Sequence, residues 1–172
     1  MERKAEPREG HTMVGVDQTF AVKGVGTVSL GLVDQGTVER HQELVAYPSG
    51  KRTVVRSIQV HDDDVEGAGS GSRVGLALKM VEVDDVPRGS ILAPKDSLRV
   101  VDSMDLELTV SPFWKDELSD GMVIHVGLGM QFEPARVSLE GTLKAGQSGK
   151  VSLSLEGKLV VGADAMPVLA WL

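Results

Sequence analysis

Hydrophobic and polar residues alternate with a period of two along most of the chain. Apolar side chains recur at every second position in residues 28–32, 74–80, 104–110 and 122–130, and in residues 54–60 with the exception of Arg56. Because successive side chains of a strand point to opposite faces, each stretch predicts a β-strand with one buried face. In the first stretch the predicted buried side consists of Val28, Leu30 and Leu32. No segment keeps a helical period over three turns.

Turn-forming residues separate these stretches and divide the chain. Clusters of Gly, Pro, Ser and Asp lie at residues 34–36, 48–50, 67–71 and 145–149. Short strands between regular turns predict an all-β fold made of barrels or sandwiches. Composition changes at residues 93–96, where we place a domain boundary. We therefore expect a frayed tail over residues 1–12 and two small β-domains over residues 13–94 and 95–172.

Composition narrows the class of protein. The 172 residues carry a net charge of -7 and contain no cysteine, which excludes disulfides and thiolate zinc sites and argues against a general nucleic-acid coat protein. Aromatic residues make up only 3%, so a base-stacking platform is hard to assemble. The polar N-terminus lacks a signal-peptide core, and no apolar run approaches the roughly 20 residues that cross a bilayer. These features predict a cytoplasmic protein with no membrane partner.

Nucleotide-binding and catalytic motifs are missing. The Gly-Lys pairs at residues 50–51, 149–150 and 157–158 are not followed by Ser or Thr, as a phosphate-binding loop requires. The chain has no asparagine, so the guanine-reading Asn-Lys-x-Asp motif cannot occur. No Gly-x-Ser-x-Gly turn is present. We therefore expect no catalytic residue and no cofactor in this chain. GTP and magnesium would be bound only by a G domain supplied elsewhere.

One acidic stretch imitates a metal site. Asp62, Asp64, Glu66 and Gly67 match the start of a calcium-binding loop, but the twelfth position, which should be a bidentate Glu, is Arg73. The four histidines show no i, i+4 spacing for a zinc pair. We therefore expect no metal site and interpret the stretch as a solvated acidic turn.

Residues 16–92 carry an ordered set of motifs. They include Phe-Ala-Val-Lys-Gly-Val-Gly-Thr-Val at 20–28, Val-Arg-Ser-Ile-Gln-Val-His at 55–61, Arg-Val-Gly-Leu-Ala-Leu at 73–78 and Pro-Arg-Gly-Ser-Ile-Leu at 87–92. Together they resemble the second domain of translational GTPases: elongation factor Tu, elongation factor 1-alpha and the selenocysteine-specific elongation factor. The details are most similar to archaeal relatives of the last. The resemblance implies a small antiparallel β-barrel of translation-factor type.

In these factors a pocket on this barrel receives the aminoacylated 3′ end of tRNA. The resemblance therefore implies Val22, Gly24, Gln59, His61 and Arg73 as candidates for binding the tRNA end. Gln59 would hydrogen-bond the terminal adenosine, and Arg73 would meet a phosphate or a carboxylate. The alternative is structural: Gln59 is a solvated side chain, and Arg73 is a surface side chain that pairs with Asp62 or Asp64.

Residues 95–172 resemble the third domain of the same factors, less specifically. In the family a glycine-containing turn and one more strand follow the segment that ends here at Trp171-Leu172. The second barrel is therefore expected to be open, closed by the N-terminal segment, or cut short. An exposed edge invites pairing, which predicts a homodimer formed through that edge.

Two functions remain open. The first is an elongation-factor-like binding module without catalysis, whose partners are aminoacyl-tRNA, the ribosome, and a GTPase domain in the full-length protein or in trans. The second is a protein-interaction barrel that has lost RNA handling, which the acidic balance and the few aromatic residues favour. Basic side chains gathered beside Gly24 would favour the first function.

Overall fold

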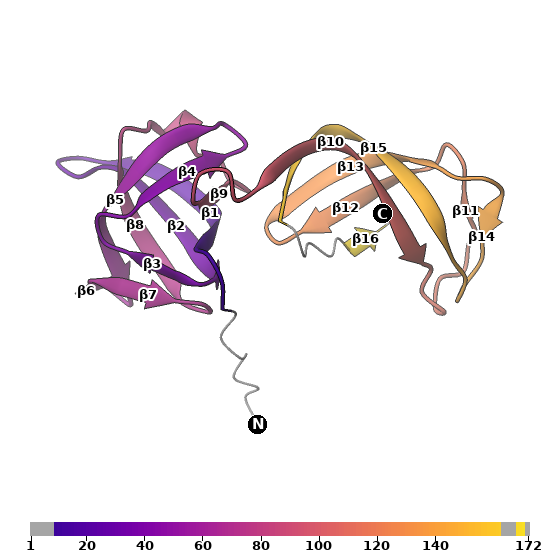
Figure 1. Cartoon of the computed structure of the whole chain (residues 1–172), viewed down its shortest axis with the longest axis horizontal. Coiled ribbons are helices and arrows are strands. Elements are labelled where there is room, and N and C mark those ends of the chain that lie inside the picture. The colour runs from indigo at the N-terminus through magenta and orange to yellow at the C-terminus, as the bar shows by residue number, and fades with distance from the viewer. Residues whose placement is uncertain (1–8, 163–167, 171–172) are drawn as a thin grey trace, which may run out of the picture. The chain divides into compact units, whose positions relative to one another are not determined.

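The computed structural model describes residues 9–162 and 168–170 of an all-β chain (Figure 1). It divides into two compact units, Met1–Arg99 and Val100–Leu172. The division falls a few residues beyond the composition break at residues 93–96. Within the described residues, the one helical element is a 3-10 turn, η1 (Val83–Asp85). The predicted all-β fold class is confirmed.

The first unit is a closed antiparallel barrel of six strands. They follow one another around the barrel in the order β4 (Glu43–Tyr47), β9 (Ile91–Ala93), β1 (Met13–Val22), β2 (Gly26–Gln35), β8 (Arg73–Lys79) and β5 (Lys51–Val60). Pairing of β4 with β5 closes the ring. Beyond the ring, β6 (Asp63–Val65) extends from β5, and a separate ribbon joins β3 (Thr37–Glu39) to β7 (Gly67–Gly69).

Branched aliphatic side chains fill this barrel. Val14, Val33, Ile58, Leu76 and Leu92 are among the core residues, each at most 1% exposed. On β5 the pairing with β8 shifts between Val55 and Ser57, which leaves Arg56 as an extra residue in a β-bulge. The bulge lets Val55 and Ile58 both point into the core although they are three positions apart.

The predicted buried face of β2 is wrong. Thr27 and Ser29 are only 6% and 1% exposed and Gly31 is buried, whereas Val28, Leu30 and Leu32 are half-buried on the outer side. Three contacts explain the inversion. A Cβ on Gly31 would lie 2.3 Å from the carbonyl oxygen of Gly15, the Ser29 hydroxyl lies 2.9 Å from that of Thr19, and Thr27 Oγ1 donates to the Val81 carbonyl at 2.8 Å.

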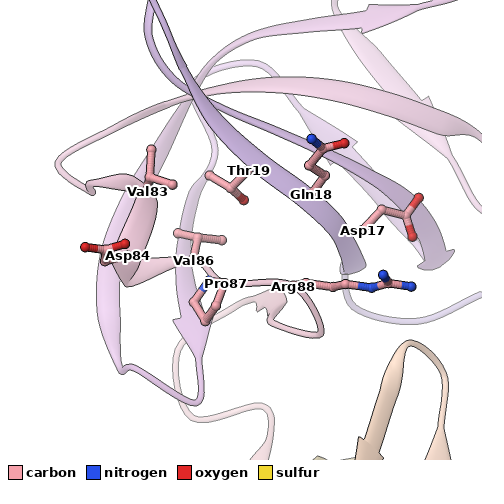
Figure 2. Close-up of a pocket in the computed structure, with 8 residues that line it drawn as sticks. All are labelled: Asp17, Gln18, Thr19, Val83, Asp84, Val86, Pro87 and Arg88. Carbon is pink, nitrogen blue, oxygen red and sulfur yellow. The ribbon is translucent and has the colours of Figure 1, made fainter.

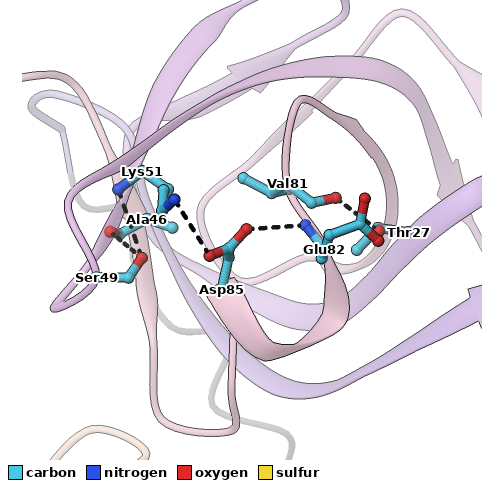
Figure 3. A network of polar contacts seen from close by, with 7 residues as sticks. All are labelled: Thr27, Ala46, Ser49, Lys51, Val81, Glu82 and Asp85. Carbon is cyan, nitrogen blue, oxygen red and sulfur yellow. Dashed lines mark hydrogen bonds and ion pairs between the residues drawn. The ribbon is translucent and has the colours of Figure 1, made fainter.

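The segment after β8 is tied to the barrel by polar contacts (Figure 3). The buried Thr27 hydroxyl donates its hydrogen bond to the Val81 carbonyl. The Asp85 carboxylate accepts a hydrogen bond from the Glu82 amide at 3.0 Å and lies 3.8 Å from Lys51 Nζ. These contacts place η1 at a fixed position next to β1.

The second unit contains a five-stranded antiparallel sheet and a two-stranded ribbon. The sheet order is β10 (Arg99–Thr109), β15 (Ser148–Val161), β13 (Gln131–Ser138), β12 (Val123–Leu128) and β16 (Val168–Ala170), and the ribbon joins β11 (Leu118–Ser119) to β14 (Thr142–Leu143). Ile124, Val126, Val137, Leu153 and Leu159, each at most 2% exposed, form its core.

In the part of the chain that the structure describes, β10 and β16 are the edges of this sheet. Asp102, Asp105 and Glu107 are exposed along β10. Charged side chains on an edge strand oppose its pairing with an identical edge. The homodimer through an open edge stays a prediction, and the charge of β10 weighs against that strand as the contact.

Replacing Gly31 by Ala tests the close approach of β1 and β2. The new methyl group would meet the Gly15 carbonyl, so we expect a loss of about 3 kcal/mol in the unfolding free energy. Gly69→Ala is the matched control, because its Cβ would meet only Thr37 Oγ1 at 3.9 Å and should change stability by less than about 0.5 kcal/mol. Urea denaturation measures both variants, and equal stabilities would contradict the packing.

Candidate ligand-binding surface on the first unit

Three neighbouring strands, β2, β8 and β5, carry small and apolar residues on the outside of the first barrel. Their register places two rows of residues side by side, Leu30–Gly75–Gln59 and Val28–Ala77–Ser57. We call these six residues the outer face. Gly75 and Ala77 sit on the central strand, so the middle of the surface is lower than its two sides.

Gly75 leaves an empty position between two larger side chains. A Cβ placed there would lie 3.5 Å from Leu30 Cδ2 and 3.9 Å from Gln59 Cβ. The two flanking strands are separated by two strand spacings, about 10 Å. A flat ring in van der Waals contact on both sides needs about 7–8 Å between the contacting carbon atoms. Leu30 Cδ2 and Gln59 Cβ cannot be farther apart than these two distances together, which is about 7 Å. A planar group between an aliphatic side chain and an amide would therefore fit over Gly75 only at the lower limit of van der Waals contact.

Charge differs between the two ends of the outer face. Lys23, Arg56 and Lys79 lie at the end where the β1–β2 turn is, and Arg56 Nη1 donates to the Val25 carbonyl at 3.0 Å. The opposite end carries the exposed carboxylates of Asp62, Asp63 and Asp64. A bound anion would therefore be attracted to the β1–β2 turn.

The structure separates the five predicted site residues into two groups. Val22 and Gly24 belong to the β1–β2 hairpin, and Gln59, His61 and Arg73 lie at the other end of the β2–β8–β5 surface. Of the five, Gln59 alone belongs to the outer face, and its Nε2 donates to Asp64 Oδ1 at 3.2 Å.

Two of these residues have structural roles. Arg73 pairs with the Asp17 carboxylate on β1, and not with Asp62 or Asp64, so the predicted alternative was correct in kind and wrong in partner. His61 and Asp62 have φ values of 52° and 69°, and they form the two-residue turn that joins Val60 to Asp63. Such turns need two residues with positive φ, which explains this conformation of His61.

Only some of the basic side chains of the first barrel gather beside Gly24. Arg40, Lys51 and Arg73 are each paired with a carboxylate elsewhere on the barrel. Lys23 and Arg56 remain next to the turn. Lys79 joins them because it follows Leu78, the partner of Thr27 on β2.

Sequence reasoning missed most of the outer face. Val28 and Leu30 were assigned to the core because they are the apolar half of an alternating pattern. An isolated glycine inside a strand is a signal for a close approach by another group, and Gly75 fits that description. That signal was available in the Arg-Val-Gly-Leu sequence at residues 73–76.

A second polar site lies next to β1 (Figure 2). Asp17, Gln18 and Thr19 of β1 line one side of a pocket of about 460 Å³, and the segment from Val83 to Arg88 lines the other. The pairing of β1 with β2 shifts between Val16 and Gln18, so Asp17 is the extra residue of a bulge. The pocket combines two carboxylates, from Asp17 and Asp84, with the Arg88 guanidinium.

Two other kinds of site are absent from the described residues. No group of three or more His, Asp or Glu side chains in residues 9–162 is arranged to hold a metal ion. No helix in this part of the chain is long and apolar enough to span a membrane.

The ion pair between Arg73 and Asp17 should add little to stability. The Arg73 side chain is 69% exposed, and pairs of this kind contribute about 0–1 kcal/mol. We therefore expect Arg73→Gln to lower the unfolding free energy by less than about 1 kcal/mol in urea denaturation. Asp17→Asn removes the other charge of the same ion pair and serves as the control. A loss of several kcal/mol in either variant would show that the pair supports the β1 bulge.

The family model for elongation factor Tu domain 2 matches residues 26–93. The selenocysteine-specific elongation factor of Methanocaldococcus jannaschii is 37% identical over 123 residues, which cover 71% of this chain and 26% of that protein. An uncharacterized protein of the same organism is 35% identical over 150 residues, which cover 87% of this chain and 46% of that protein.

A solved structure extends the match to nearly the whole chain. Translation elongation factor SelB from Methanococcus maripaludis, in its apo form, superposes with a TM-score of 0.83 at 27% sequence identity, covering 98% of this chain and 39% of that one. This chain thus spans less than half the length of each of these relatives. The matched segment contains all six residues of the outer face. Residues 26–93 are therefore a domain 2 of the elongation factor Tu type, and the chain belongs to the translational GTPase family.

Proposed function

We propose that this chain is the tRNA-handling part of an elongation-factor-like protein, and that its outer face receives the aminoacylated 3′ end of a tRNA. The main observation in support of this proposal is the empty position at Gly75 between Leu30 and Gln59. The GTPase domain, with its GTP and magnesium, is supplied elsewhere in a longer protein or in trans. The chain itself performs no catalysis and works in the cytoplasm, with the ribosome as a further partner.

The chemistry of the outer face suits a terminal nucleotide. The base lies over Gly75, with Leu30 against one face and the Gln59 amide against the other. The hydrogen bond from Gln59 to Asp64 orients that amide before the ligand arrives, which reduces the entropy cost of binding. Phosphates preceding the terminal nucleotide lie toward Lys23 and Lys79, away from the carboxylates of Asp62–Asp64.

A second candidate function is a protein-interaction barrel. The net charge of -7 and the acidic end of the outer face favour it, because both oppose a polyanion. The two functions differ in their response to salt. Contacts to phosphate release counterions, so RNA affinity falls steeply with salt concentration, whereas a mainly apolar protein contact is much less sensitive.

Titration of labelled aminoacyl-tRNA at about 50 and 200 mM salt tests the proposal. We expect binding at low salt that weakens at high salt. Gly75→Leu should weaken binding about tenfold to a hundredfold, because a branched side chain would occupy the space of the base, whose stacking contributes about 1–3 kcal/mol. Gly75→Ala should have a smaller effect.

Two controls make the titration decisive. Gly69→Ala changes a glycine of the same barrel outside the outer face and should bind like the unaltered chain. Deacylated tRNA tests whether the aminoacyl group contributes. Absence of binding at low salt, or full affinity in Gly75→Leu, would contradict a tRNA-end site on the outer face.

A further inference from the structure

The β1–β2 turn has almost no packing of its own. Gly24 and Gly26, on either side of Val25, have φ values of 83° and 100°, and no atom lies within 4 Å of the Cβ positions that a side chain would occupy there. Val25 is 39% exposed. Two glycines separated by a single residue give the backbone many accessible conformations. A contact from outside the turn would narrow that range.

Arg56 contacts this turn from another strand. Its Nη1 donates to the Val25 carbonyl at 3.0 Å, across β8 from β5. Within the described residues, the other hydrogen bond of Val25 is local, from its amide to the Val22 carbonyl at 3.0 Å. The turn is thus closed by its own hydrogen bond and by the pairing of Val22 with Gly26, and Arg56 adds a contact from another strand.

The β-bulge fixes the starting point of that side chain. Arg56 is the unpaired residue of the β5–β8 ladder, and bulges redirect side chains in this way. The carbonyl of Arg56 accepts a hydrogen bond from Arg40 Nε at 3.3 Å, and the amide of His41 donates to the Val55 carbonyl at 2.8 Å. Arg40 is itself paired with Glu66 at 3.0 Å. The bulge is thus held from both sides, by β8 and by the segment after β3.

We propose that Arg56 is a positioning residue that holds the Lys23–Val25 turn in the conformation required at the basic end of the outer face. Its role in ligand affinity rests on the proposed function, whereas its role in ordering the turn does not. Arg56 acts through the Val25 carbonyl and makes no phosphate contact. In Arg56→Lys the shorter side chain is expected to lose this contact, because Nη1 lies at the far end of the guanidinium.

Amide exchange in the unliganded chain, measured by NMR, tests the ordering role. In Arg56→Lys we expect the Val25 amide to exchange about tenfold faster, because the carbonyl of the same residue has lost a charge-assisted hydrogen bond. Lys79→Gln is the matched control, since it removes a neighbouring positive charge and leaves the hydrogen bond to Val25 intact. Its Val25 amide should exchange at the original rate.

Exchange in the core separates a local effect from unfolding. The amides of Ile58 and Leu76 should keep their rates in Arg56→Lys. An unchanged Val25 rate in this variant would overturn the proposal, as would equal acceleration in Lys79→Gln. Acceleration confined to the turn in Arg56→Lys would support it.

The salt dependence of aminoacyl-tRNA binding tests the role in affinity. Arg56→Lys should weaken binding several-fold and leave the slope of log affinity against log salt unchanged, because no phosphate contact is lost. In Arg56→Gln, a slope that is lower by about 0.7 would indicate that a direct phosphate contact to single-stranded RNA has been lost. That result would overturn the positioning role. If the unaltered chain does not bind aminoacyl-tRNA, the proposed function fails, and the exchange rates still decide whether Arg56 orders the turn.

Discussion

The close approach of β1 and β2 is the constraint on which the first barrel depends. Where Gly31 faces the Gly15 carbonyl, there is no room for even one methyl group. The inward positions of β2 are consequently two hydroxyl residues, Thr27 and Ser29, then Gly31, and only beyond it an apolar side chain, Val33. The oxygens of Thr27 and Ser29 have partners within the barrel. The larger side chains of β2 must then lie on the outer side. The apolar part of the candidate site is thus a consequence of how the barrel closes, because a core too narrow for Val28 and Leu30 displaces them to the surface.

The outer face gains its direction from charge. Its small residues provide a low, apolar surface, but they do not distinguish one end from the other. Lys79 and Arg56 at one end, and Asp62–Asp64 at the other, impose a polarity along β5 and β8. An elongated ligand with one charged and one neutral end would therefore bind in a single orientation. Dissolved ions screen electrostatic interactions beyond about 10 Å, so the local charge at a surface matters more than the net charge of the chain. A chain with an acidic overall balance can therefore still offer a site to part of a polyanion.

The sequence predicts the fold of this protein better than its site, and the reason is physical. Turn residues and alternation are local, so they predict the strands and the all-β class, and the motifs at residues 16–92 predict the family. Which face of a strand is buried depends on the neighbour across the barrel. For β8 the apolar side is the core side. On β5 the alternation fails at the bulge, where Val55 and not Val54 is buried, and β2 reverses the rule because of Gly31. Arg73 shows the same limit at the level of one side chain. The expected partners, Asp62 and Asp64, lie about ten residues before Arg73 in the sequence, whereas the partner in the structure is Asp17, on a strand much farther away in sequence.

Arg56 illustrates what a bulge adds to this arrangement. In a regular strand, the residue between Val55 and Ser57 would pair with β8 and belong to one of its two faces. The extra residue changes the phase of the strand, so that Val55 and Ile58 both reach the core and Ser57 and Gln59 both reach the outer face. The same irregularity aims Arg56 at the β1–β2 turn. One local insertion therefore links three features: a filled core, an outer face with small residues in register, and an ordered turn at the basic end. For this reason the Val-Arg-Ser-Ile-Gln segment is better understood as a unit than as a strand that happens to contain one candidate ligand residue, Gln59.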